Sequence, residues 1–225
     1  MSYVVPWSYS SLTGFETCPF KFYEVRIAKT TKAKPFKEAA EGTKKHSDIE
    51  LYLKGEKGLE DTSLQSLVDR TLAGLDYAHL KFEHKLAITK DLKPTDFFAK
   101  DCYHRGVLDV QYVHPEESVA KLFDWKNGKI NAYSKQLVAN AITVFVHNPH
   151  VERVDYSYVW MKHDEVTDGR VYRQHFMKDW NKFVERVEKM EQALINNYWP
   201  KCPSGLCKKH CEVTTCEHNG SYQNA

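Results

Sequence analysis

The chain has 225 residues, of which 42% are hydrophobic and 13% aromatic, so it can bury the core of a full domain and is not a disordered tail. Its 32 basic and 30 acidic residues give a formal charge of only +2, which excludes a globally basic protein that coats nucleic acid. No apolar run reaches the ~20 residues of a membrane span, and the first residues lack the pattern of a signal peptide. We therefore expect a cytoplasmic protein that does not associate with a membrane.

Helices are predicted in the first third of the chain. Trp7 to Leu12 opens a short helix with hydroxyl residues that can cap it, and Cys18-Pro19 interrupts it. Residues 38–53 form a second helix, with His46 on the same inward stripe as Ile49. An inward histidine is either a satisfied core residue or a ligand, so the residues alone leave both roles open for His46. Residues 64–78 predict a third, amphipathic helix, and residues 82–89 a strand.

Residues 106–129 carry the pattern that most resembles catalytic machinery. Residues 107–113 and 119–126 are rich in β-branched and aromatic side chains and predict a β-hairpin around His114-Pro115. This hairpin would place Asp109 directly opposite Asp124, with Cβ atoms about 4.5 to 5.5 Å apart. Asp124 and Lys126 share one face of their strand, whereas Trp125 points to the other face.

Two facing carboxylates repel each other unless a cation lies between them. Mg²⁺ prefers such oxygen ligands and keeps water molecules that can act as a nucleophile. Lys126 would position the attacking water or stabilise developing negative charge. The alternative from these residues alone is a hairpin whose acids are simply solvated.

The remaining elements are predicted to be largely scaffold. Residues 131–147 form a helix with Gln136 and Asn140 four residues apart on one face. Residues 154–162 and 170–176 predict a second hairpin around Asp168-Gly169, which is a strong turn signal. A long helix then extends from residue 176 to 198 and ends before Pro200.

The last 25 residues contain a dense set of potential metal ligands. This segment is too short to fold by apolar burial, so a bound metal would provide its stability. A zinc site would use four ligands that are all local, drawn from Cys202, Cys207, His210, Cys211, Cys216 and His218. An iron-sulfur cluster would use Cys207, Cys211 and Cys216 together with the distant Cys18.

In motif order, the chain resembles the RecB-like branch of the PD-(D/E)xK nucleases, which includes the AddB nuclease and the iron-sulfur CRISPR-associated exonuclease. The resemblance rests on Ser-Tyr-Ser-x-Leu followed by Cys18-Pro, Gly42-x-x-x-His46, Gly106-x-x-Asp109, Asp124-x-Lys126 and Gln136. Two positions depart from the family pattern. Asn140 replaces a tyrosine, and the last three cysteines are spaced Cys-x3-Cys-x4-Cys where the family has Cys-x2-Cys-x5-Cys.

The resemblance implies roles for these residues. His46, Asp109 and Asp124 would bind Mg²⁺ or Mn²⁺, the carbonyl of Trp125 would provide a further oxygen, and Glu83 is a candidate for the same shell. Lys126 would assist the attack of water, and Gln136 belongs to the catalytic set. Cys18, Cys207, Cys211 and Cys216 would hold an iron-sulfur cluster, with Zn²⁺ as the alternative. Local DNA-binding cations near the metal site would be Lys21, Arg26, Lys44, Lys45 and Lys129.

We therefore expect an α/β fold of the restriction-endonuclease type, with a central mixed sheet flanked by helices. Residues 1–200 would form the nuclease domain, and residues 201–225 a cysteine-rich cap packed with the N-terminal segment. The expected function is a metal-dependent DNA exonuclease that acts on single-stranded or duplex ends in repair or recombination, with a helicase or recombination protein as a partner. The alternative is a non-catalytic DNA-binding or assembly module with a zinc-binding tail.

Overall fold

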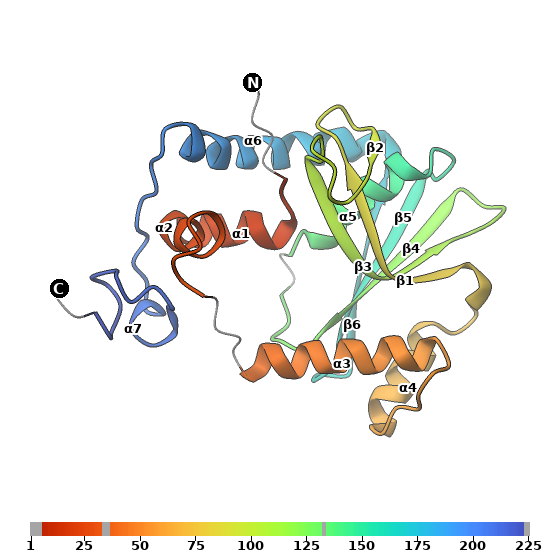
Figure 1. Cartoon of the computed structure of the whole chain (residues 1–225). Coiled ribbons are helices and arrows are strands. Elements are labelled where there is room, and N and C mark those ends of the chain that lie inside the picture. The colour runs from red at the N-terminus through yellow and green to blue at the C-terminus, as the bar shows by residue number, and fades with distance from the viewer. Residues whose placement is uncertain (1–5, 33–36, 132–133, 223–225) are drawn as a thin grey trace. The chain divides into compact units, whose positions relative to one another are not determined.

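The computed structural model of the chain describes residues 6–32, 37–131 and 134–222, and Figure 1 labels its elements. Its strands are β1 (Leu80–Ile88), β2 (Pro94–Thr95), β3 (His104–Val113), β4 (Val119–Lys126), β5 (Arg153–Trp160) and β6 (Glu165–Tyr172). The α-helices are α1 (Tyr9–Thr17), α2 (Pro19–Phe22), α3 (Lys37–Leu53), α4 (Thr62–Thr71), α5 (Gln136–His147), α6 (Phe176–Ile195) and α7 (Cys207–His210). Short η helices cover Tyr23–Ile27, Tyr77–His79 and Arg173–His175.

The strands form one six-stranded sheet in the order β2-β1-β3-β4-β5-β6. Neighbouring strands are antiparallel except β4 and β5, which are parallel. A parallel pair needs a crossover connection, and α5 provides it. The predicted α/β fold with a mixed sheet flanked by helices is therefore confirmed.

Alternation along β4 assigns its residues to the two faces of the sheet. Phe123 and Trp125 are buried in a cluster that also contains Ile49 of α3 and Leu67 of α4. Because side chains alternate along a strand, Asp124 and Lys126 point to the opposite face, where α5 begins. The hydrophobic packing of one face thus fixes the direction of the polar residues on the other.

Helix α5 lies very close to strand β3. A Cβ atom added at Gly106 would come within 2.4 Å of the Asn140 side chain, so only glycine permits this approach. His147 at the other end of α5 lies 2.8 Å from the carbonyl oxygen of Ala87 in β1. Asn140 is therefore a buried packing residue between helix and sheet.

The predicted turn of the second hairpin was wrong. The turn lies at residues 161–164, where Asp164 has a φ of 54°, and Asp168-Gly169 is inside β6. Gly169 is paired with Tyr156 of β5, and a Cβ atom there would come within 2.3 Å of the tyrosine ring. This glycine accommodates a cross-strand aromatic ring and does not form a turn.

Two helices are also shorter than predicted at their C-terminal ends. Helix α4 ends at Thr71, because the chain turns shortly afterwards through Gly74, which has a φ of 78°. Helix α6 ends at Ile195, and Asn197 follows in the left-handed region with a φ of 45°. Apolar residues continue beyond both ends, so periodicity alone placed the ends too late.

The chain divides into two compact units, Met1–Pro6 with Phe36–Asn181 and Trp7–Pro35 with Lys182–Ala225. The first contains the sheet. In the second, Trp7 stacks near Phe183 with ring centroids 5.6 Å apart, and Arg186 donates two hydrogen bonds to the carboxylate of Glu16. Within the described ranges, no helix is long and apolar enough to cross a membrane.

Candidate active site

The β3–β4 hairpin sets the positions of the two candidate aspartates. Its register pairs Val110 with Phe123 and Val113 with Ala120. The ladder ends at Val110 and Phe123, so Asp109 and Asp124 lie one step beyond its last pair. At that step the backbone N–H of Trp125 donates to Oδ2 of Asp109 at 2.9 Å. A side-chain carboxylate thus accepts a bond that a backbone carbonyl accepts in a regular ladder, and this holds Asp109 in place.

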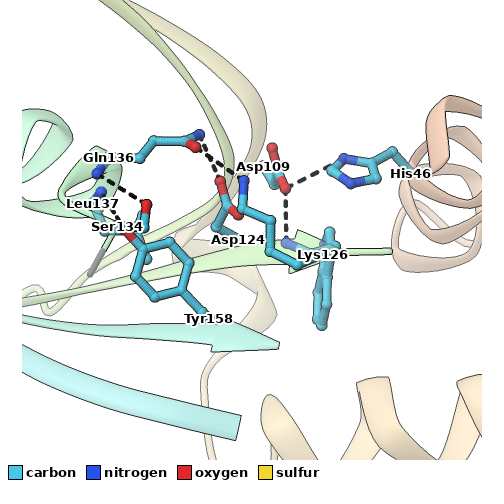
Figure 2. A network of polar contacts seen from close by, with 9 residues as sticks. His46, Asp109, Asp124, Lys126, Ser134, Gln136, Leu137 and Tyr158 are labelled. Atoms are coloured by element: carbon cyan, nitrogen blue, oxygen red, sulfur yellow. Dashed lines mark hydrogen bonds and ion pairs between the residues drawn. The ribbon is translucent and has the colours of Figure 1, made fainter. Parts of the chain in front are cut away.

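Asp124, Lys126 and Gln136 form a closed ring of polar contacts, drawn in Figure 2. Nζ of Lys126 lies 2.5 Å from Oδ2 of Asp124 and donates to Oε1 of Gln136 at 2.9 Å. Nε2 of Gln136 donates to Oδ1 of Asp124 at 2.7 Å. The Asp124 side chain is 3% exposed, and that of Lys126 is 28% exposed, so the ring is open to solvent on the lysine side.

The fold places Gln136 in this ring from the first residue of α5. Tyr158 of β5 fixes the beginning of the helix, because its hydroxyl oxygen accepts a hydrogen bond from the backbone N–H of Leu137 at 3.0 Å. Burial raises the pKa of Tyr158 to about 12, so this hydroxyl stays protonated. Tyr158 is not among the site residues that the sequence motifs predict. Its signal is the alternation along β5, which places Tyr158, Tyr156 and Trp160 on one face.

A second group of side chains meets beside this ring. Nδ1 of His46 lies 3.3 Å from Oδ2 of Asp109, as Figure 2 shows. Glu83 of β1 completes a set of three ligand side chains whose donor atoms all lie within 4.8 Å of one another. Glu83 has a φ of 45°, which is unusual for a residue other than glycine inside a strand. The ladder of β1 and β3 pairs residues on both sides of Glu83 and Asp109.

Packing of α3 brings His46 to the strands. Ile49 and Leu53, three and seven residues after His46, are buried against the core. Gly42 lies against Asn127, directly after β4, so this helix passes close to the end of the strand. The ring of His46 also hydrogen-bonds to the backbone of Trp125, which brings the predicted carbonyl ligand to the same group.

The electrostatics of the site favour a bound cation. Burial, and secondarily the charge of Asp124, raises the pKa of Asp109 well above its ordinary value. Burial also raises the pKa of Asp124, although Lys126 opposes this shift, and it raises the pKa of Glu83. Burial lowers the pKa of His46. Neutral imidazole nitrogen and carboxylate oxygens are the donors that Mg²⁺ and Mn²⁺ accept, so the residues fit a hard divalent ion.

The predicted cysteine ligands all belong to the second unit. Sγ of Cys18 caps α2 by accepting a hydrogen bond from the backbone N–H of Lys21 at 3.5 Å. Cys207 begins α7, Cys211 follows it, and Cys216 is buried. Burial raises the pKa of the Cys216 thiol, with a smaller contribution from Cys211. Among the described residues, the cysteines do not share a group of three donor atoms within 4.8 Å.

The predicted DNA-binding cations differ in their surroundings. Lys21 pairs with Glu212 at 2.6 Å, and Lys45 pairs with Glu41 at 3.6 Å. Arg26, Lys44 and Lys129 are exposed. Lys21 and Arg26 lie in the second unit, and the other three lie in the first.

Comparison with known proteins bears on the whole chain. A search of curated proteins finds no significant match. A solved structure titled "Crystal structure of SSO0001" is similar with a TM-score of 0.45 and 13% sequence identity, over 95% of this chain and 87% of that chain. The profile of the PD-(D/E)XK nuclease superfamily matches residues 6–216. Because this match extends over nearly the full length and includes the hairpin with Asp109, Asp124 and Lys126, the chain belongs to the PD-(D/E)XK nuclease superfamily.

Proposed function

We propose that this protein is a metal-dependent deoxyribonuclease that removes nucleotides from DNA ends. The observation that carries the proposal is the meeting of Asp109, Asp124 and Lys126 on one hairpin, within a chain of a nuclease superfamily. The exonuclease mode, and a role in repair or recombination beside a helicase or recombination protein, rest on the resemblance to RecB-like nucleases. Single-stranded and duplex ends are both candidate substrates.

The residues divide into ligands and a catalytic cation. His46, Glu83, Asp109 and Asp124 would hold Mg²⁺ or Mn²⁺, with the carbonyl of Trp125 as a further donor. When bound, such an ion polarises a phosphodiester and lowers the pKa of a coordinated water. The side chain of Lys126 is 28% exposed and its ammonium group lies beside Asp124, where it can orient water or stabilise charge on a phosphate oxygen. Gln136 holds Lys126 and Asp124 in fixed relation through its two side-chain bonds.

For the second unit, we propose that Cys18, Cys207, Cys211 and Cys216 bind an iron-sulfur cluster. Support comes from the pairing of Lys21, three residues after Cys18, with Glu212, which is adjacent to Cys211. This ion pair links the N-terminal segment with the tail. In this proposal residues 201–225 form a cap that is separate in function from the nuclease domain. A zinc site made of tail residues alone is the alternative.

The test is cleavage of end-labelled single-stranded and duplex DNA in Mg²⁺ or Mn²⁺, with covalently closed circles as a control for end dependence. We expect Asp109→Asn, Asp124→Asn and Lys126→Ala each to lower the turnover rate more than about 100-fold, because even second-shell changes at metal sites cost 10- to 100-fold. Asp168→Asn is the matched control, since Asp168 lies on β6 and accepts a hydrogen bond from Ser157 at 2.6 Å.

Metal binding can be measured separately by thermal stability. Mg²⁺ should stabilise the wild-type protein, because a ligand that binds only the folded state increases its free energy of unfolding. Either aspartate variant should lose much of this effect, whereas Lys126→Ala should keep it. Wild-type turnover in an aspartate variant would show that the hairpin is not the active site. Cleavage of closed circles would replace the exonuclease proposal with an endonuclease. DNA binding without cleavage by the wild type would favour the non-catalytic alternative.

A further inference from the structure

The loop between β1 and β3 exposes an aromatic cluster. The side chain of Phe98 is 80% exposed, the highest value among the large apolar residues that the structure describes. Its ring centroid lies 5.1 Å from that of Phe97, in an edge-to-face arrangement. The guanidinium of Arg105 lies 5.1 Å from the centroid of Phe97 and 5.5 Å from that of Phe98. Lys85 adds a second cation, 5.9 Å from the centroid of Phe97.

Hydrogen bonds of the backbone and of side chains keep this cluster in place. Residues 96–99 form a turn in which the N–H of Ala99 donates to the carbonyl of Asp96 at 3.0 Å. Arg105 donates to the carbonyl of Phe97 at 3.1 Å, and Thr95 donates to Asp101 at 2.7 Å. The loop therefore presents the ring of Phe98 to solvent in a defined position, without the loss of conformational freedom that binding otherwise costs.

The cations of the cluster lie on the same two strands as candidate metal ligands. Arg105 and Asp109 lie four residues apart on β3, which is about 13 Å along a strand. Lys85 is two residues from Glu83 on β1, and its charge acts on the Glu83 carboxylate against the effect of burial. A bound strand a few nucleotides long can therefore reach from the candidate ligands to Phe98.

We propose that Phe97, Phe98, Arg105 and Lys85 form a stacking platform for a base of single-stranded nucleic acid, a few nucleotides from the phosphodiester that is cut. Every base has an aromatic face that stacks on an exposed ring, and the two cations fit the phosphates of the same strand. A protein surface that binds single strands combines these same features. The inference rests on the proposed function, and it makes the single strand the preferred form of the substrate on this side of the site.

The first test measures binding with no cleavage, in the presence of a chelator, using a short single-stranded oligonucleotide that contains 2-aminopurine. Phe98→Ala should weaken binding roughly 5- to 150-fold, which corresponds to the loss of one stacked base. It should also remove the fluorescence quenching that stacking causes. Phe98→Trp should retain both. Val166→Ala is the matched control, because Val166 is an exposed apolar residue on β6.

A salt titration separates stacking from charge. Phe98→Ala should keep the slope of log affinity against log salt, and Lys85→Met should reduce it by about 0.7, because one phosphate contact is lost. Unchanged affinity and quenching in Phe98→Ala would overturn the platform, and a surface that docks a protein partner would give that result. Because these measurements need no turnover, they remain separate from the proposed function. A wild type that binds through Phe98 without cleaving would refute the nuclease proposal alone.

Discussion

The two compact units hold their candidate ligand residues in different ways. In the first, Asp124 lies on a strand whose opposite face packs Phe123 and Trp125 against α3 and α4. This packing orients the Asp124 carboxylate, and the backbone N–H of Trp125 holds that of Asp109. In the second, α7 is only four residues long, and Cys18, Cys207 and Cys211 are half-buried. Val213 and Cys216 are buried, but much of the tail is exposed.

Polar contacts lie within the tail, and one ion pair connects it to the N-terminal segment of its unit. Lys201 pairs with Glu217 at 2.6 Å, Lys21 with Glu212 at 2.6 Å, and Asn219 donates to the carbonyl of Cys211 at 2.8 Å. The pair of Lys201 and Glu217 is exposed on both sides and contributes little, whereas Glu212 is buried beside Lys21. A site that is built on a sheet gains its order from apolar burial. A short cysteine-rich segment needs a different source of stability, and the iron-sulfur cluster or zinc ion proposed above would provide it.

The largest expected effect is a loss of stability in the second unit that leaves the first unit folded. Cys18→Ser should remove bound iron and lower the unfolding temperature by roughly 5–10 °C, because the binding free energy of the metal contributes to folding. Elemental analysis and thermal melts measure the two results, and the stabilisation by Mg²⁺ should persist. Cys202→Ser is the control and should change neither. If the protein instead contained zinc, and if Cys202→Ser lost the zinc while Cys18→Ser kept it, the local zinc site would be established.

The next largest effect concerns the candidate active site of the first unit, which is ordered by packing. Gln136→Ala should lower kcat about 10- to 100-fold, because Lys126 and Asp124 lose the side chain that connects them. Oligonucleotide affinity should stay near the wild-type value, since Gln136 acts through the other two residues. Kinetics and a binding titration measure the two quantities, with Gln174→Ala as an exposed control. If Gln136→Ala instead weakened oligonucleotide affinity about 10- to 100-fold and left kcat unchanged, Gln136 would be assigned to substrate binding.

Lys21 tests whether a polar contact orders the tail. Lys21→Met should lower the free energy of unfolding by about 1–2 kcal/mol, because the Glu212 side chain is 7% exposed and loses a charge-assisted bond. Limited proteolysis should then cut residues 201–222 faster. Lys44→Met, which changes an exposed lysine of α3, is the control for stability. If Lys21→Met weakens DNA binding and leaves stability unchanged, the predicted contact with DNA is the correct role for Lys21.

The smallest effect concerns pH in the first unit. In metal-free protein, burial and Asp124 raise the pKa of Asp109 far above the ordinary value of about 3.9. From about pH 4 up to that raised pKa, the folded state binds more protons than the unfolded chain, so the free energy of unfolding falls as pH rises. Asp109→Asn should flatten this dependence and melt a few degrees higher near neutral pH. Thermal melts in chelator from pH 5 to 8 measure it. A steeper fall in the variant would contradict the assignment.

The sequence alone determined those features that depend on local pattern. Alternation and β-branched residues predict the hairpin of β3 and β4, and its register follows from the short connection at His114 to Ser118. The spacing of His46, Ile49 and Leu53 predicts the helix that presents His46 to the core side. The order of these motifs also identifies the superfamily. The hairpin register and the face of the helix are short-range properties, because the backbone period fixes which residues are neighbours on a strand or helix.

Only the tertiary structure decided features in which distant segments meet. Glu83 joins His46 and Asp109 because β1 pairs with β3, and its positive φ has no signature in the sequence. The local sequence around Gly169 predicts a turn. The residue nevertheless lies in β6, because the ring of Tyr156 on the neighbouring strand occupies the space that a Cβ atom would take. Phe98 is an apolar residue of the type that is usually buried in a core, but the hydrogen bonds of its turn direct its side chain into solvent. Contacts between residues far apart in the chain compete with local preference, and at Glu83 and Gly169 the distant contacts prevailed.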